Sequence, residues 1–171
     1  VLTADGPRTD LSDVTTTTYY SDGDSDPAKR GRLRTVTNAL GHVTTINGYT
    51  LSGKATVTLD PNAVESDTSY DALDRLTGTT IKGATAPEDI TTAYLLNNDG
   101  LPTTVTLPNG NTLTYTYDTV HRLTQVTNQP GEKTVFSYDT EGRKTREEVQ
   151  DALSVVKRFT NFAYDAYTRL Q

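Results

Sequence analysis

The sequence predicts an all-β protein made of tandem antiparallel β-hairpin repeats of about 21–26 residues. Two observations support this. The pattern that runs from Tyr117 to Arg122, which is Tyr-Asp, three variable residues and Arg, recurs at nearly fixed spacing. Between the copies, runs that alternate apolar and polar residues with a period of two are separated by turn residues. A fixed period of this length indicates units that pack on their neighbours in an array.

The good copies of the pattern place Tyr, Asp and Arg at the same points of the frame. They are Tyr70, Asp71 and Arg75; Tyr117, Asp118 and Arg122; Tyr138, Asp139 and Arg143; and Tyr164, Asp165 and Arg169. Degenerate copies begin at Tyr49 and Leu96, so the frame starts at 49, 70, 96, 117, 138 and 164, with intervals of 21, 26, 21, 21 and 26 residues. A disordered chain has no reason to space its tyrosines in this way, so we expect a folded array.

A second mark of the repeat is a glycine nine residues after the Arg position. From Arg32, Leu101 and Arg122 this offset leads to Gly41, Gly110 and Gly131, which we predict to be turn residues. The same offset from Lys54 leads to Ala63. The two long repeats, after Arg75 and Arg143, have five extra residues and no glycine at that place.

The frame divides the chain into a leading region and an array. Residues 1–18 end in a run of threonines, which predicts a strand because β-branched side chains suit a pleated surface. The array covers 19–171, with units near 19–48, 49–69, 70–95, 96–116, 117–137, 138–163 and 164–171. In the first unit we expect Arg32 to be the Arg position and Tyr20 to precede an exposed loop rich in Asp, Gly and Pro.

Residues 111–131 show how one unit is expected to fold. Leu113, Tyr115 and Tyr117 alternate with threonines, which predicts a half-buried strand. A short loop, a second strand over 123–127, a turn over 128–131 and a third strand over 133–138 follow. No helix is predicted; the best candidate, 146–153, is expected to be part of an extended hairpin.

One feature does not fit simple alternation. The strand after each Arg has Leu at the first place and Val at the fourth, as in Leu33 and Val36 or Leu123 and Val126. These positions lie on opposite faces of a regular strand. Either both faces are partly buried, or the strand contains a bulge or a strong twist.

The composition restricts the classes of protein. Only 33% of the residues are hydrophobic, below the roughly 45–50% of globular domains, which favours a thin structure with a small core in each repeat. The net charge of -6 and the pI near 4.8 argue against nucleic-acid binding, which needs a basic surface. There is no cysteine, and no signal peptide or membrane-spanning run is visible, so no membrane insertion by this segment is predicted.

The arrangement resembles the YD-repeat (Rhs) family, which includes Rhs toxins, insecticidal toxin-complex shells and teneurins. The resemblance covers about residues 19–171 and rests on the four Tyr-Asp pairs, the Gly-Arg pairs at 31–32 and 142–143, and the Asn-x-x-Gly turns that end at Gly41 and Gly131. It implies that the hairpins form part of a curved spiral β-shell. Val1 is not an initiator and Gln171 follows an Arg-Leu pair, so we expect a section of a longer array.

The resemblance also implies a function. Such a shell is a structural module of a bacterial secreted or cell-surface protein, and it encloses a C-terminal toxin or effector. Its partners would be the remaining repeats of the same polypeptide and that effector. The self-cleavage motif of the family centres on Asp-Pro-x-Gly; Asp26-Pro27 and Asp60-Pro61 lack the glycine, so no protease activity is carried over. The alternative is a cell-surface adhesin or a carbohydrate- or receptor-binding module that uses the threonine faces and long loops.

The repeated residues themselves are expected to be structural, because a catalytic residue need not be copied in every unit. Each Tyr is predicted to stack on the Tyr of the next unit. Each Asp is predicted to accept backbone N–H bonds in its loop and to pair with the Arg four residues on. No catalytic residue is predicted.

Other candidate sites are weak. Asp22, Asp24 and Asp26 alternate as in a calcium loop, but Pro27 and Leu33 stand where an EF-hand needs Gly and Glu. A solvated acidic loop is the preferred interpretation, and no cofactor is predicted. His42 and His121 occupy unrelated places of the repeat, so a zinc pair or a nucleophile–base pair is not expected. A hydrolase would need two convergent carboxylates, which no pattern here indicates.

Overall fold

The chain folds almost entirely into β-strands. The computed structural model describes residues 1–4, 13–165, 167 and 169–171, and it confirms the all-β prediction. The described helix is a single short 3-10 turn, η1 (Ala86–Glu88). The chain forms two compact units, residues 1–92 and 93–171, which are described separately. The division into a leading region and seven repeat units stays a prediction.

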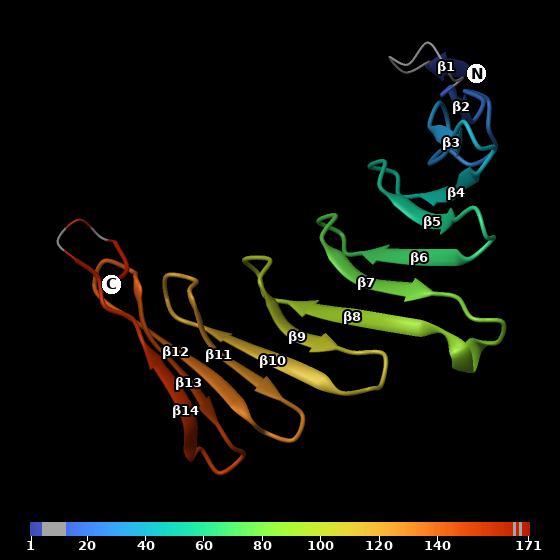
Figure 1. The fold of residues 1–171 in the computed structure, drawn as a ribbon. Helices are drawn as coiled ribbons and strands as arrows, with labels where there is room; N and C mark the ends of the chain where they lie inside the picture. Colours follow the sequence, from blue (N-terminus) through green and yellow to red (C-terminus); the bar gives the residue numbers. More distant parts are fainter. Residues whose placement is uncertain (5–12, 166, 168) are drawn as a thin grey trace. The chain divides into compact units, whose positions relative to one another are not determined.

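In the first unit the strands lie side by side in chain order and run antiparallel (Figure 1). The Thr-rich run forms a strand as predicted, and it pairs with a short strand near the N-terminus that the sequence analysis does not identify. The strands are β1 (Leu2–Ala4), β2 (Thr15–Tyr19), β3 (Leu33–Thr37), β4 (Val43–Tyr49), β5 (Ala55–Leu59), β6 (Glu65–Tyr70) and β7 (Leu76–Ile81). The connection from β7 to β8 (Ile90–Leu96) contains η1.

The second unit follows the same rule from the end of β8 onward. Its further strands are β9 (Pro102–Thr106), β10 (Thr112–Tyr117), β11 (Leu123–Asn128), β12 (Lys133–Tyr138), β13 (Lys144–Gln150) and β14 (Val156–Asn161). Each strand is hydrogen-bonded to the next along the chain. The segment 146–153 is β13 and the turn after it, so the extended hairpin predicted there is confirmed.

Most turns at both edges of the sheet share one geometry. The first residue of a five-residue turn donates its N–H to the carbonyl of the fifth and accepts from the N–H of the fourth, as in Asp118 with Arg122 and His121. The fourth residue adopts a positive φ, which favours glycine. Gly41, Gly110 and Gly131 occupy this place with φ of 80°, 82° and 91°. Non-glycine residues that occupy it are Ala63, Asp74, His121 and Ser154.

A β-bulge explains the spacing of Leu and Val after each Arg. Tyr117 lies opposite Leu123, and Tyr115 lies opposite Val126, with a register shift between Thr116 and Tyr117. Residues directly opposite each other in an antiparallel pair share a face. Leu123 and Val126 therefore lie on the same face as the tyrosines, and the bulge is the correct alternative. Similar shifts occur next to Tyr19, Tyr49, Tyr70, Leu96 and Tyr138.

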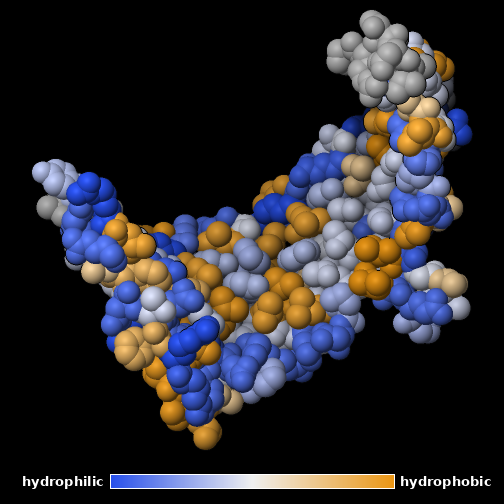
Figure 2. Space-filling view, viewed as in Figure 1, coloured by the Kyte–Doolittle hydropathy of each residue, from blue (hydrophilic) through white to orange (hydrophobic). Residues whose placement is uncertain are grey.

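The sheet is a single layer. Among the described residues the buried hydrophobic side chains are only Ala28 and Val105, and no polar side chain is buried. Figure 2 shows hydrophobic side chains in patches over the strands, with hydrophilic ones frequent toward the turns. Stability therefore comes from half-buried side chains on the sheet and from contacts between neighbouring repeats, as the low apolar content predicts.

Candidate functional site

The Tyr-Asp-x-x-x-Arg pattern forms a repeated clip at one edge of the sheet. In the clearest copy, Asp118 Oδ1 accepts the backbone N–H groups of Val120 and Arg122, at 3.0 and 2.9 Å. Its Oδ2 accepts Nε–H of Arg122 at 2.7 Å. The equivalent Arg donates its backbone N–H and its Nε–H in the same way to Asp71, Asp139 and Asp165. The structure thus contains both contacts that the sequence predicts for this aspartate.

These bonds lower the pKa of the aspartates. At Asp71, Asp118 and Asp165 the main cause is the backbone N–H of the Arg four residues on, and the Arg side chain adds to it. At Asp139 burial acts in the opposite direction, but the backbone and side-chain donors of Arg143 still lower the pKa. The clip therefore holds each carboxylate in its charged form.

Each repeat tyrosine reaches back to the preceding hairpin. The hydroxyl donates to the backbone carbonyl of the residue that follows the Arg position of the preceding unit. The pairs are Tyr49 with Leu33 at 2.6 Å, Tyr70 with Ala55 at 3.3 Å, Tyr117 with Pro102 at 2.9 Å, Tyr138 with Leu123 at 2.7 Å and Tyr164 with Lys144 at 2.9 Å. Burial raises the pKa of Tyr49 and of Tyr117, so both hydroxyls stay protonated donors.

A cation of the preceding unit covers the ring of most of these tyrosines. The pairs are Arg32 over Tyr49, Lys54 over Tyr70, Arg122 over Tyr138 and Arg143 over Tyr164, with the cation 4.7–5.4 Å from the ring centre. The recurring contact that the structure shows is thus a cation on a ring, while the stack of tyrosine on tyrosine stays a prediction.

The Arg or Lys also reaches the next turn along the same edge. Arg32 Nη2 donates to the carbonyl of Leu51 at 2.8 Å, and Lys54 Nζ donates to the carbonyl of Asp74. Gly53 leaves space for this contact, because a Cβ there would lie 1.8 Å from Arg32 Nη1. Arg122 makes all three kinds of contact: it binds Asp118 in its own turn, lies over the ring of Tyr138, and donates from Nη1 to the carbonyl of Asp139 in the next turn at 3.4 Å.

Degenerate copies keep the turn with other side chains. Thr50 Oγ1 accepts the N–H groups of Gly53 and Lys54, and Asn97 Oδ1 accepts the N–H of Leu101. In the first unit Tyr19 lies opposite Leu33, as the repeat tyrosines do, and Tyr20 donates its N–H to Arg32 where the others have Asp. Tyr19 is therefore the frame position of the first unit, and Tyr20 takes the place of the Asp.

The comparisons with known proteins agree with this geometry. The sequence model of a family described as RHS Repeat matches residues 97–131, which contain β9, β10, β11, the turns before β9 and β10, and the clip of Asp118 and Arg122. This segment therefore matches an RHS repeat, and the same clip recurs in the other units at Asp71, Asp139 and Asp165. No curated protein matches the sequence.

Solved structures with the same fold are parts of toxin complexes. The crystal structure of TcdB2-TccC3-TEV has a TM-score of 0.77 at 13% identity and covers 98% of this chain. TcdB2-TccC3-Cdc42 has a TM-score of 0.66 at 13% identity over 92% of the chain. The Photorhabdus luminescens Tc holotoxin pore has a TM-score of 0.58 at 16% identity over 90%. The chain spans only 9%, 8% and 10% of the length of those chains.

The aspartates of the acidic loop in the first repeat accept hydrogen bonds from the backbone of the same loop. Asp24 Oδ1 accepts the N–H of Asp26, and Asp26 Oδ1 accepts the N–H of Ala28, both at 2.9 Å. Asp22, the third weak candidate, lies beside Gly31. Among the described residues no group of three His, Cys, Asp or Glu side chains could hold a metal ion.

The two histidines lie in different turns. His42 Nδ1 is 3.4 Å from Asn38 Nδ2 within its own turn. His121 Nε2 is 3.3 Å from Asp99 Oδ2 in the preceding turn of the same edge. The structure thus gives each a partner of its own. In the described part of the chain no helix is long and apolar enough to cross a membrane.

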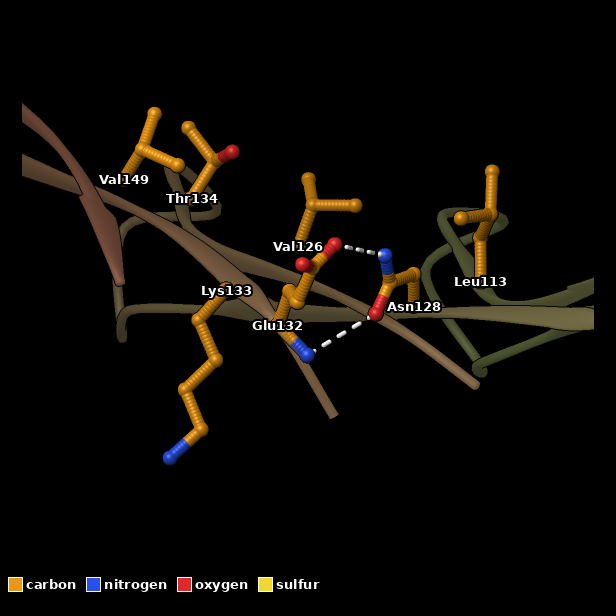
Figure 3. Close-up of a pocket in the computed structure, with 7 residues that line it drawn as sticks. All are labelled: Leu113, Val126, Asn128, Glu132, Lys133, Thr134 and Val149. Carbon is orange, nitrogen blue, oxygen red and sulfur yellow. Dashed lines mark hydrogen bonds between the residues drawn. The ribbon is translucent and has the colours of Figure 1, made fainter. Parts of the chain in front are cut away.

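A shallow pocket of about 240 Å³ lies on the tyrosine face of the second unit (Figure 3). It is lined by Leu113, Val126, Asn128, Glu132, Lys133, Thr134 and Val149. No sequence pattern indicates this pocket, because its members come from four strands and one turn and share no motif. The only sequence signal is that small side chains stand two residues before the aromatic ones, as Thr134 before Phe136.

Proposed function

We propose that this chain is a section of the wall of a hollow β-shell that encloses a C-terminal toxin or effector. The observation that carries the proposal is the single-layer sheet of RHS repeats, whose fold matches toxin-complex structures over 98% of the chain. A single layer can serve as a wall when neighbouring hairpins are tied tightly, and the repeat tyrosines at 49, 70, 117, 138 and 164 each tie their hairpin to the preceding one. Further repeats of the same polypeptide would continue the wall.

In this proposal the wall is structural and has no enzyme activity. The charged residues of the clips are used in contacts with each other and with backbone groups, and the same contacts recur in unit after unit. A secreted or cell-surface bacterial protein is the setting that fits, because the similar structures are toxin complexes. Containment then depends on how firmly neighbouring hairpins stay joined.

The experiment uses the whole polypeptide that contains this chain, with its C-terminal segment. Limited proteolysis should leave that segment intact while the repeats are folded. Tyr117→Ala combined with Tyr138→Ala should loosen the wall and expose the segment to the protease. Cleavage of the segment at the same rate in the intact and the loosened protein would overturn the proposal. Imaging the same protein should show whether the tyrosine face is turned toward the enclosed polypeptide.

The second candidate is a cell-surface adhesin or a carbohydrate- or receptor-binding module. The observation in its favour is the opposite face of β9–β11, where threonines lie across from each other, as Thr106 does from Thr112 and Thr114 from Thr104 and Thr127. A face of hydroxyl groups suits polar ligands. Binding of glycans to the isolated chain, lost in a Thr104→Val and Thr114→Val variant, would favour this function over containment.

A further inference from the structure

The pocket on the second unit has an apolar floor with a structural cause. Val126 lies opposite Thr134, and Thr134 lies opposite Val149, so three neighbouring strands present small side chains to one face. Leu113 completes the floor from β10. The larger rings of Tyr115 and Phe136 stand two residues further along β10 and β12, on the same face. On this face, the side chains are therefore shorter at the pocket floor than at the neighbouring positions of Tyr115 and Phe136, and this difference forms the hollow.

A carboxylate lies at the mouth of this floor. Asn128 Nδ2 donates to Glu132 Oε2, and the N–H of Glu132 donates to Asn128 Oδ1, both at 2.8 Å. Figure 3 shows the Glu132 side chain on the same side of the sheet as Val126, while Lys133 points to the opposite side. The Lys133 ammonium donates to Ser154 Oγ at 2.8 Å. Among the described residues no cation forms an ion pair with Glu132, so its charge is left for a partner.

The size of the pocket restricts what can occupy it. Small-molecule and cofactor sites are typically about 300–1,000 Å³ and enclose their ligand. This pocket holds about 240 Å³ and is open, which suits one aliphatic side chain with its neighbours lying across the surface. In protein interfaces, an apolar anchor in a pocket supplies affinity, and a charged rim supplies specificity.

From these observations we propose that the pocket binds an extended polypeptide segment that places Leu, Ile or Val on the floor and an adjacent Lys or Arg on Glu132. A cation already lies beyond the other end of the pocket. Arg158 in β14 is paired with Val149 and is two strands away from Glu132, so a basic residue of the segment would be repelled there. The basic residue of the segment is therefore expected at the Asn128 end of the pocket. The idea that the bound segment belongs to the enclosed polypeptide rests on the proposed function. The existence of the binding site does not, and it is tested separately.

The test is a titration of the full chain with two short blocked peptides, observed by NMR of the Leu and Val methyl groups. One peptide contains Gly-Lys-Leu-Gly and the other Gly-Glu-Leu-Gly, each raised to millimolar concentration. With the lysine peptide, the methyl signals of Leu113, Val126 and Val149 should shift severalfold more than with the glutamate peptide. In the Glu132→Gln variant this preference should disappear, while in the control Glu141→Gln, on the opposite edge, it should remain.

Equal shifts with both peptides, or shifts that avoid these three residues, would overturn the proposal. The comparison of the two peptides on the unmodified chain decides it even if a variant fails to fold. The result is also separate from containment. If the lysine peptide binds preferentially but the C-terminal segment is not protected from the protease, the docking site is supported and the shell proposal is wrong. Protection without preferential binding would leave the shell and remove the docking site.

Discussion

The hydroxyl of Tyr138 donates a 2.7 Å hydrogen bond to the carbonyl of Leu123, the residue that follows Arg122. The guanidinium of Arg122 lies 4.7 Å from the centre of the same ring. A tyrosine of one repeat is thus held from two directions by consecutive residues of the preceding repeat. Because these contacts join hairpins rather than lie within one, they determine how firmly the array holds together.

Replacing the hydroxyl tests the first of these contacts. Tyr138→Phe keeps the ring and removes the donor to Leu123, so we expect a loss of about 0.5–1.5 kcal/mol in the free energy of unfolding. Tyr115→Phe is the matched control, since its hydroxyl has no hydrogen-bond partner within the described ranges. Urea unfolding of both variants measures the difference. If the two variants lose the same stability, the bond to Leu123 contributes nothing.

A double-mutant cycle tests the cation over the ring. Arg122→Gln, Tyr138→Leu and the double variant should give a coupling of about 0.5–1 kcal/mol between the two side chains. Arg122→Lys should keep part of this coupling, because Lys54 lies 5.0 Å from the ring of Tyr70 at the equivalent place. Additive losses in the cycle would show that the guanidinium and the ring act independently.

The acid sensitivity of the array follows from the clip aspartates. Their pKa values are lowered in the folded chain from the ordinary 3.8, so the unfolded chain binds protons first. The stability they contribute is full above pH 3.8 and is lost as the pH falls through the lowered values. Asp118→Asn should make the decline in unfolding midpoint below pH 3.8 shallower, while Asp60→Asn, at a turn of the other edge, serves as the control. A decline unchanged by Asp118→Asn would contradict this explanation.

The turns provide a test of backbone strain. Ala63 has a φ of 62°, where a side chain is strained, so Ala63→Gly should stabilise the chain by up to about 1 kcal/mol. Gly41 has a φ of 80° and nothing within 4 Å of an added Cβ, so Gly41→Ala should lose roughly 1–2 kcal/mol from strain alone. Thermal unfolding of both variants should show a higher melting temperature for Ala63→Gly and a lower one for Gly41→Ala. Destabilisation by Ala63→Gly would show that another contact holds this turn.

Much of the fold could be predicted because short sequence patterns determine its strands and turns. The alternation of Leu113, Tyr115 and Tyr117 predicts β10, and the nine-residue offset leads to turn residues with positive φ such as Gly131. The bonds from Asp118 to its own loop follow from residue type and a separation of four. Each of these features involves residues that are close in sequence.

The contacts between repeats could not be predicted in the same way. The acceptor for Tyr138 is a backbone carbonyl, which every residue has, so the sequence does not mark Leu123. The place of Arg122 over the ring of Tyr138 joins residues of two repeats that are sixteen positions apart in sequence, and no local pattern indicates it. Tyr19 and Tyr20 both fit the frame by type, and only the register opposite Leu33 distinguishes them. The pocket depends on the sizes of side chains that lie next to each other on four strands, and these residues are far apart in sequence.

Gly53 tests whether the link between repeats needs space as well as contacts. A Cβ at this residue would lie 1.8 Å from Arg32 Nη1, and the φ is 106°, so Gly53→Ala should add a clash to the backbone strain. We expect it to lose more stability than Gly41→Ala, which adds strain alone. In an Arg32→Ala background the clash is absent, and the loss from Gly53→Ala should fall to that of Gly41→Ala. Chemical unfolding of the four variants measures both terms. An equal loss from Gly53→Ala with and without Arg32 would show that the guanidinium moves aside freely and that the cation does not hold the next turn in place.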